Sequence, residues 1–475
     1  MKFIKENGPH IKSNDSTSKI MTRFLIALTP IICFAIFKNS VIVYSYASKG
    51  FIESLHPLFM IIVGALTSFI SETLYYKIVL KNDLRTSLYE SYRSFGIISG
   101  ILLALVLPPN IPLWLVSFGS FTGSIIGKML FGGFGQNIFN PALLGYLFIS
   151  ASYSNLMGSP FNAYELDTIG GATPLSNLMN FNYTGSFENI VSPFGDLFNL
   201  FVGNIPGAIG EVSKLLIIIS FIYLVITKTI KWIIPTIYVT TVFILTFIIS
   251  KYIDAGVWYS LFHILSGGLL FGAVFMATDP VTSPLTTIGQ ILHGLSLGIL
   301  TVLLRFLTPY PEGVMTSILF MNMLVPLFDK IGIKARNNIR NIIIIVITFI
   351  LIIIISILNI THKLDKNSSN VSELDSKVNI LEVKEDGNKK IYEVTSKGWG
   401  LIKADVEVED KNIKSIIIKD SKDETQWNEI EKNNYIYKVI QNQNNIDKLD
   451  AVSGSTYSSN ALKNIVKKVK IEEAK

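Results

Sequence analysis

The chain has 475 residues, of which 49% are hydrophobic and 16% charged, and its mean hydropathy of +0.46 excludes an ordinary soluble protein of this size. A single cysteine, Cys33, excludes a disulfide framework and an iron–sulfur cluster ligated by this chain alone. The net charge of +6 does not indicate nucleic-acid binding, because the excess lysine and arginine lies in short loops between apolar segments. The five histidines show no metal-ligand spacing, so we expect no metal site. The composition predicts a polytopic membrane protein.

Eleven apolar segments follow the polar N-terminus, and most approach the roughly 20 residues that a membrane-spanning helix needs. We expect these helices near residues 20–37, 57–76, 95–108, 113–131, 140–156, 213–229, 232–250, 258–278, 288–307, 313–329 and 341–360. Lysine and arginine cluster in the N-terminal tail and after the second, sixth and tenth segments, which is one side of the membrane if every segment crosses. The positive-inside rule makes that side the cytoplasm. The N-terminus is then expected inside, and loop 157–212 and the chain after the eleventh segment outside.

Two of these segments are interrupted at matching places in the two halves of the chain. The third segment ends in Pro108 and Pro109, and its counterpart five segments later is glycine-rich and ends at Asp279-Pro280. This pattern predicts about ten helices as a 5+5 inverted repeat, plus one further helix, whereas ordinary proline-terminated helices are the alternative. Charged side chains at membrane depth are costly, so Asp279, and less strongly Glu72 and Glu211, are candidates for an ion pathway.

The composition changes after the eleventh segment. Residues 361–376 are polar and are expected to form a linker. Alternating apolar and polar residues predict strands at 378–386, 389–398, 402–410, 412–420 and 435–441, and residues 458–473 have helical periodicity. These elements predict a small exported α+β domain of about 100 residues, which is long enough to bury its own core.

One motif occurs twice, each time in a region that the charge distribution assigns to the outside. Residues 167–173 read DTIGGAT and residues 450–456 read DAVSGST. A turn of small residues lets backbone N–H groups approach an anion closely. The threonine that ends each motif, Thr173 or Thr456, is therefore a candidate for a covalent phosphoester, with an unmodified surface turn as the alternative.

The chain resembles the Rnf-type and Nqr-type ion-translocating redox complexes over nearly its whole length. Residues 132–146, 167–175, 203–214, 275–284 and 310–329 are similar to the membrane subunit RnfD or NqrB, and residues 398–400, 423–425 and 450–459 to the FMN-carrying subunit RnfG or NqrC. The resemblance implies a natural fusion. Its parts would be an RnfD-like membrane domain at 1–335, an RnfG-like transmembrane helix at 336–360, the linker at 361–376 and an exported FMN-binding domain at 377–475.

The same resemblance implies two FMN groups, attached through their phosphates to Thr173 and Thr456 by a separate flavin transferase. The family pattern reads Ser/Thr-Gly-Ala-Thr, and this chain departs from it at Gly170 and Ser455. Other implied flavin-binding residues are Gly171, Ala172, Asp450, Ser453, Gly454, Ser455, Trp399, Glu424 and Thr425, although Trp399 in such a small domain can also be a core residue. A non-covalent riboflavin is implied near Asn137 and Asn140, for which a helix-capping turn is the alternative.

The resemblance implies a component of a plasma-membrane complex that passes electrons between ferredoxin and NAD⁺ and couples this transfer to export of Na⁺ or H⁺. We expect the chain not to be catalytic alone. Sites for ferredoxin and NADH would lie on other membrane and iron–sulfur subunits, because the sequence has neither a cysteine cluster nor a dinucleotide-binding glycine motif. Two alternatives stay open: a secondary transporter or channel with an exported accessory domain, and an exported flavin-dependent sensor or reductase.

Overall fold

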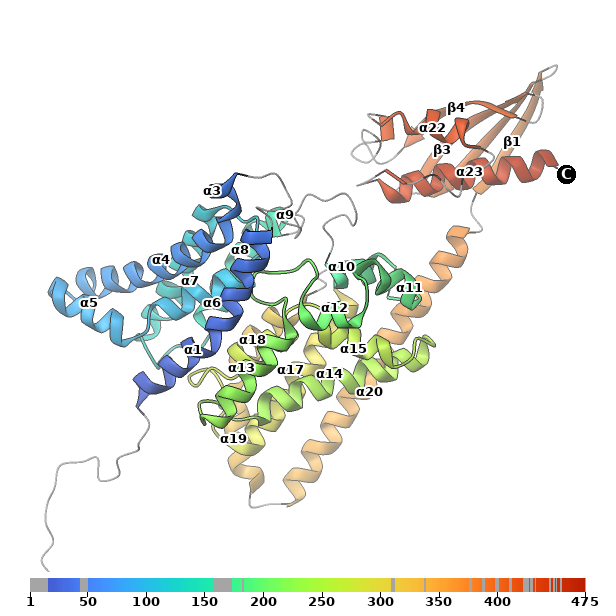
Figure 1. The fold of residues 1–475 in the computed structure, drawn as a ribbon. Helices are drawn as coiled ribbons and strands as arrows, with labels where there is room; N and C mark the ends of the chain where they lie inside the picture. Colours follow the sequence, from blue (N-terminus) through green and yellow to red (C-terminus); the bar gives the residue numbers. More distant parts are fainter. Residues whose placement is uncertain are drawn as a thin grey trace, which may run out of the picture. The chain divides into compact units, whose positions relative to one another are not determined.

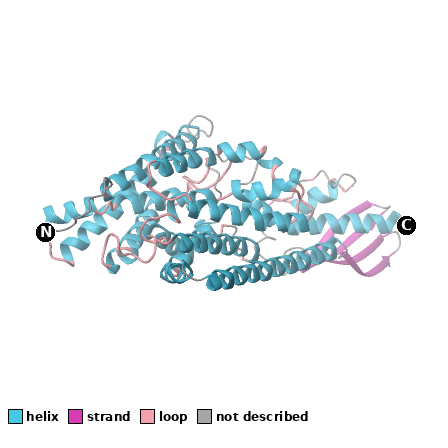
Figure 2. Ribbon diagram, turned by 90° about the horizontal axis from the view of Figure 1, so that it is seen from below, coloured by secondary structure: helices cyan, strands magenta, loops and turns pink. Residues whose placement is uncertain are grey.

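The computed structural model in Figure 1 forms two units, Met1–Leu364 and Asp365–Lys475. It describes residues 16–42, 50–157, 173–181, 183–308, 312–336, 339–375, 378–386, 389–397, 401–409, 412–421, 427, 430–431, 433–443, 446, 449, 451–452 and 455–474. Among these residues the strands all belong to the second unit, and the first unit is helical, as the colours of Figure 2 show.

The first unit contains helices at all eleven expected apolar segments. The first five are α1 (Thr17–Ile36), α4 (His56–Ile78), α6 (Ile97–Val106), α7 (Leu113–Gly127) and α8 (Pro141–Ser152), with α3 (Phe51–Ser54), α5 (Leu84–Arg93) and α9 (Ser154–Met157) between them and the π-helical turn η1 (Phe37–Ile42) after α1. The next five begin with α13 (Lys214–Ile226), α14 (Ile233–Tyr252) and α15 (Val257–Leu265), which leads into α16 (Leu269–Phe271) and η4 (Gly272–Met276). They end with α17 (Thr287–Leu307), α18 (Val314–Asn322) and α19 (Val325–Arg336), and α20 (Ile339–Asp375) follows.

The two groups of five helices pack in a similar way. Helix α4 contacts α6 and α7, and α7 contacts α8; likewise α14 contacts α15 and α17, and α17 contacts α18 and α19. The first helices of the two groups, α1 and α13, also contact each other. This packing agrees with two five-helix halves, and their inverted orientation stays a prediction.

Six described helices are long and apolar enough to cross a membrane, and two further spans are broken. The chain bends by 62° between Leu265 and Leu269 and by 64° between α18 and α19. Helices α6, α8 and α13 are shorter. Broken and short helices free backbone groups inside the membrane, and these groups need protein partners.

A layer of short helices follows the first group of five helices in the chain and precedes the second group. It consists of α10 (Pro174–Asn180), α11 (Phe187–Ile190), the 3₁₀ turn η3 (Ser192–Phe194) and α12 (Leu197–Val202). In Figure 1 α10, α11 and α12 lie above α14 and α15, whereas α19 and the start of α20 lie at the lower edge of the first unit.

Helix α17 fixes which features lie at each edge, because its 21 residues extend over about 30 Å. At its start, the Asp329 carboxylate accepts the Thr286 N–H at 2.8 Å, and Lys231 Nζ lies 3.5 Å from the Leu285 carbonyl oxygen. At its end, the Arg305 carbonyl oxygen accepts the Tyr183 hydroxyl at 2.6 Å. The short-helix layer therefore lies at the opposite end of α17 from the basic α13–α14 turn and from the start of α19, which precedes the basic residues 330–340.

The second unit is a four-stranded antiparallel sheet with helices packed on it. Strands β1 (Val378–Asp386), β2 (Lys389–Lys397), β3 (Leu401–Glu409) and β4 (Asn412–Ser421) pair in chain order, and α22 (Tyr435–Gln441) and α23 (Thr456–Ala474) contact the sheet. The expected strands before residue 421 and the expected C-terminal helix are confirmed. The core joins both layers, with Val394 and Val406 of the sheet and Leu462 and Ile465 of α23 all fully buried.

One expectation for this region was wrong. Residues 435–441 form a helix rather than a strand, because Tyr435 and Val439, four positions apart, both enter the core. Most of the segment expected as a linker, 361–376, is helical, because α20 runs on to Asp375. The polar composition of that segment ends the membrane span without ending the helix.

Candidate functional site

Thr173 lies directly before α10 and caps its N-terminus. Its Oγ1 accepts the Ser176 N–H at 3.3 Å and lies 2.8 Å from Ser176 Oγ, and Pro174 occupies the first helical position. This is the ordinary chemistry of a threonine cap followed by proline. Thr173 is only 3% exposed, so the residue is buried rather than part of an open surface turn.

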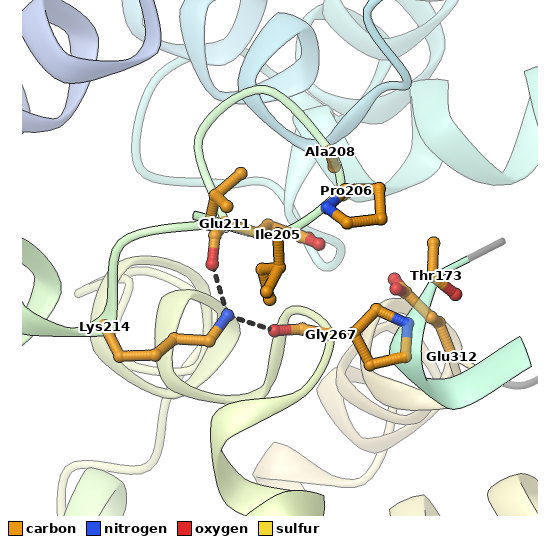
Figure 3. Close-up of a pocket in the computed structure, with 11 residues that line it drawn as sticks. Thr173, Ile205, Pro206, Ala208, Glu211, Lys214, Gly267 and Glu312 are labelled. Carbon is orange, nitrogen blue, oxygen red and sulfur yellow. Dashed lines mark hydrogen bonds between the residues drawn. The ribbon is translucent and has the colours of Figure 1, made fainter. Parts of the chain in front are cut away.

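A pocket opens beside Thr173, drawn in Figure 3. Four parts of the chain form it: the start of α10, the segment from the α12–α13 loop to the first residue of α13, the break between α15 and α16, and the segment just before α18. Its lining residues are Thr173, Pro174, Ile205, Pro206, Gly207, Ala208, Glu211, Val212, Lys214, Gly267 and Glu312. The site thus joins loop 157–212 to the broken span of the second half.

Lys214, the first residue of α13, connects two walls of this pocket. Its ammonium donates to the backbone carbonyls of Glu211 and Gly267, the latter at 2.6 Å, as the dashed lines in Figure 3 show. The side chain is 1% exposed. Gly267 has a φ of +63°, which an L residue rarely adopts, and this conformation turns the chain at the break between α15 and α16. Lys214 therefore ties the α12–α13 loop to the broken span.

Two carboxyl groups line the same pocket. Glu211 is 2% exposed, and among the described residues neither of its carboxylate oxygens has a hydrogen-bond partner. Burial, and secondly the Glu312 carboxylate, hold the pKa of Glu211 well above its usual range. Burial likewise raises the pKa of Glu312, against the opposing effect of Arg305. Burial thus opposes ionisation of both carboxyl groups.

A second pocket lies at the opposite end of α17, near the basic loops. It joins α1, α6, the α13–α14 turn and the segment after η4, and its lining residues are Ile20, Met21, Phe24, Ile98, Leu102, Asn140, Thr229, Ile230, Phe275, Asp279 and Pro280. The structure thus brings together Asn140 and Asp279, which the sequence analysis had assigned to two different roles. The Asp279 carboxylate accepts the Thr282 hydroxyl at 2.9 Å.

The Gly-Asn segment before α8 makes a turn and a cap. Gly132, Gly133 and Gly135 all have positive φ values. Asn140 Oδ1 accepts the Ala142 N–H at 3.0 Å, and Asn137 Nδ2 donates to the Phe139 carbonyl at 2.9 Å. The capping interpretation of Asn140 is therefore confirmed, and Asn140 lines a pocket as well.

Glu72, an expected pathway residue, is paired. Its carboxylate lies 2.6 Å from Lys128 Nζ, and the two side chains are 0% and 6% exposed. Ser94 joins them, because its hydroxyl donates to Glu72 and its carbonyl oxygen accepts from Lys128 at 3.0 Å. Glu211 and Asp279 line separate pockets, so the three acidic residues do not form one cluster.

The second threonine motif lies in the second unit. Thr456 is the first residue of α23, and Ser455 before it is buried, with its N–H donating to the Val452 carbonyl at 3.0 Å. Other expected flavin-binding residues lie outside the described part of the chain: Gly171, Ala172, Trp399, Glu424, Thr425, Asp450, Ser453 and Gly454. Both motifs thus end at a threonine beside the start of a helix.

Sequence reasoning missed Lys214. It stands at the start of an apolar helix, where a lysine is ordinarily an interfacial residue whose ammonium reaches water. The available signal was its position, three residues after Glu211 in a stretch already matched to a known family. Only the fold shows that its ammonium points into the pocket of Thr173.

These features define a class of protein. The first unit is a polytopic helical membrane domain with broken spans and buried charges, and the second is a small α+β domain whose last helix begins at a threonine. The family described as "NQR2, RnfD, RnfE family" matches residues 4–338, and the FMN-binding domain matches residues 398–470. The chain therefore belongs to the NQR2, RnfD, RnfE family and carries an FMN-binding domain in its C-terminal part.

The relatives of the membrane domain are components of redox complexes. The chain is 37% identical to a component of the proton-translocating ferredoxin:NAD(+) oxidoreductase complex of Clostridium ljungdahlii, over 69% of this chain and 94% of the relative. It is 34% identical to a component of the Na(+)-translocating ferredoxin:NAD(+) oxidoreductase complex of Acetobacterium woodii, over 68% and 92%. It is 38% identical to a component of the Na(+)-translocating NADH-quinone reductase of Stutzerimonas stutzeri, over 50% and 59%.

Proposed function

We propose that this chain is the flavin-carrying component of a membrane complex that passes electrons between ferredoxin and NAD⁺ and couples the transfer to translocation of Na⁺ or H⁺. The observation that carries the proposal is the joining, in one chain, of a domain of the NQR2, RnfD, RnfE family with an FMN-binding domain. The names of the relatives in Clostridium ljungdahlii and Acetobacterium woodii support ferredoxin and NAD⁺ as the electron carriers.

Two covalent flavins are part of the proposal, one on Thr173 and one on Thr456. The described residues around Thr173 fit a phosphate-linked group, because a threonine hydroxyl and a buried lysine line one pocket. FMN, when bound, supplies the one- and two-electron chemistry. The chain's own residues hold the phosphate, cap α10 and exclude water.

The geometry of the first unit supports a common side for the two flavins. Near the end of the candidate membrane span of α20, Ile342–Leu364, Lys363 Nζ donates to the Phe306 carbonyl at 2.7 Å and lies 6.0 Å from the centre of the Tyr183 ring. Tyr183 belongs to the short-helix layer that follows Thr173. Helix α20 therefore leaves the first unit at the end that carries Thr173, opposite the basic loops, and the FMN-binding domain follows it in the chain.

Topology and partners complete the proposal. The basic loops lie in the cytoplasm with the N-terminus, and Thr173 and the C-terminal domain face the outside of the plasma membrane. A flavin transferase attaches both groups, and other membrane and iron–sulfur subunits carry the ferredoxin and NADH sites. The inner pocket of Asn140 and Asp279 suits a riboflavin or the translocated ion, because it joins an apolar wall to an amide and a carboxyl group.

In-gel flavin fluorescence of the denatured chain, made together with its transferase, tests the proposal. We expect Thr173→Ala and Thr456→Ala each to lose about half of the fluorescence and the double variant to lose all of it. A wild-type chain without fluorescence would instead support a transporter or channel with an accessory domain. Fluorescence without co-purifying redox subunits would support a reductase or sensor that acts alone.

A further inference from the structure

The pocket beside Thr173 contains a buried ammonium group, that of Lys214, whose bonding partners the proposed function does not specify. Lys214 Nζ has three N–H donors, and in the described structure it donates to the carbonyls of Glu211 and Gly267. No carboxylate in the described part of the chain lies within ion-pair distance of it. A buried charge that contacts only neutral partners is costly, so such a group ordinarily has an anion close by.

Neither carboxyl group of the pocket serves as the anion beside the Lys214 ammonium. Glu211 turns its carboxylate toward Gly268, where an added Cβ would collide with it, and both carboxylate oxygens lack described partners. Glu312 lies against Gly267, because a Cβ there would be 3.3 Å from Glu312 Oε1. Among the lining residues that the structure describes, Lys214 supplies the one cationic side chain.

We propose that Lys214 is the cation that binds the phosphate of the group attached to Thr173. This inference rests on the proposed function and assigns a residue to the phosphate side of that site. A phosphate esterified to both threonine and the ribityl chain is a diester with one negative charge, and one ammonium balances it. A charge-assisted hydrogen bond from the third N–H of Lys214 stabilises the diester without removing the two carbonyl bonds.

The same arrangement assigns a role to the two acids. An ionised Glu312 beside a phosphate diester would repel it, whereas a protonated carboxyl group can donate a hydrogen bond to it. Substitution by glutamine keeps the shape and a donor but removes the ability to ionise. The inference therefore predicts opposite signs for substitutions that remove the positive charge and those that remove the potential negative charge.

Both proposed flavin sites are on one chain, so flavin attachment at Thr456 is an internal reference for flavin attachment at Thr173. Chymotrypsin cleaves after Leu166 and Leu175 to release the Thr173 motif, and after Leu449 and Tyr457 to release the Thr456 motif. We would make the full-length chain with a limiting amount of flavin transferase, so that neither site saturates. Mass spectrometry then gives the ratio of the two flavin-bearing peptides.

We expect Lys214→Gln to lower the Thr173-to-Thr456 flavopeptide ratio at least about fivefold, as for the loss of one charge-assisted hydrogen bond. Lys214→Arg keeps the charge and is expected to stay within about twofold of the wild type. Glu312→Gln is expected to match or exceed the wild type. An unchanged ratio in Lys214→Gln overturns the inference, and so does a fall in Glu312→Gln equal to that in Lys214→Gln, because this would reflect a general loss of pocket structure.

The Glu312→Gln result keeps the test decisive even if Lys214→Gln does not accumulate, since a ratio below that of the wild type would contradict a phosphate-binding role for Lys214. A wild-type chain with FMN on Thr456 and none on Thr173 would refute the proposed function at this site. A wild-type chain with FMN on both residues and variants that do not differ would refute only the role of Lys214.

Discussion

The buried pair of Glu72 and Lys128 gives the sharpest prediction about stability. Glu72→Gln removes the negative charge and leaves the ammonium, which is 6% exposed, with neutral acceptors in this cluster, the introduced amide oxygen and the Ser94 carbonyl. Removing one partner of a buried ion pair costs about 3–5 kcal/mol. We therefore expect Glu72→Gln to lower the free energy of unfolding of the membrane unit by about 3 kcal/mol.

The assay is unfolding of the purified full-length chain in mixed micelles by increasing denaturing detergent, followed by tryptophan fluorescence. The double variant Glu72→Leu/Lys128→Met is the control, because it replaces both charges with apolar side chains of similar size. We expect the double variant to lie within about 1 kcal/mol of the wild type. A Glu72→Gln chain within about 0.5 kcal/mol of the wild type would refute this explanation.

The same variants separate a structural role of Glu72 from a role in the ion pathway. If the carboxylate serves to neutralise Lys128, the double variant keeps ion translocation in proteoliposomes that contain the assembled complex. If a double variant of normal stability loses ion translocation, Glu72 has a role in the ion pathway, as the sequence predicted.

Two further predictions concern packing. Gly100→Ala places a methyl group against the backbone of α4 near Gly64 and is expected to destabilise the membrane unit by about 3 kcal/mol, whereas Gly50→Ala, with open space around it, is expected to change the detergent midpoint little. Leu462→Ala removes a fully buried side chain between α23 and the sheet and is expected to lower the free energy of unfolding of the C-terminal domain by about 2–5 kcal/mol. The measurement is the rate of proteolysis of this domain in the full-length chain, which we expect to rise. Ile417→Ala, at a position 61% exposed, is the control and is expected to have little effect.

Much of the fold could be predicted because membrane-spanning helices can be recognised from their apolar composition alone. A long run of apolar residues must become a helix in the bilayer, and the sequence therefore located all eleven helical segments. The breaks after Leu265 and Asn322 were not visible in the same way. Backbone freed at a break depends on partners from distant segments, which no local pattern reveals.

In the second unit, too, a local sequence pattern did not determine which element forms. Residues 435–441 alternate like a strand, yet four-residue spacing of Tyr435 and Val439 also suits a helix, and packing against α23 decides between them. Short apolar segments commonly fit both periods. The four strands before them were recognisable because turns with charged or small residues separate long alternations.

At the candidate site, the sequence identified chemical groups but not their neighbours. Glu72 and Lys128 are 56 positions apart, and Thr173 and Glu312 are separated by most of the second half, so their proximity follows from the fold. Lys214 was missed for the same reason. The twin threonine motifs could be found because their residues are adjacent in the chain.

The intact mass of the chain purified with its transferase tests the central claim most directly. We predict a mass above that of the 475-residue sequence by two FMN units, each less one water, and the loss of one unit in Thr173→Ala and in Thr456→Ala. A wild-type chain that has the mass of the bare sequence, or that keeps both units when either threonine is replaced, would contradict it.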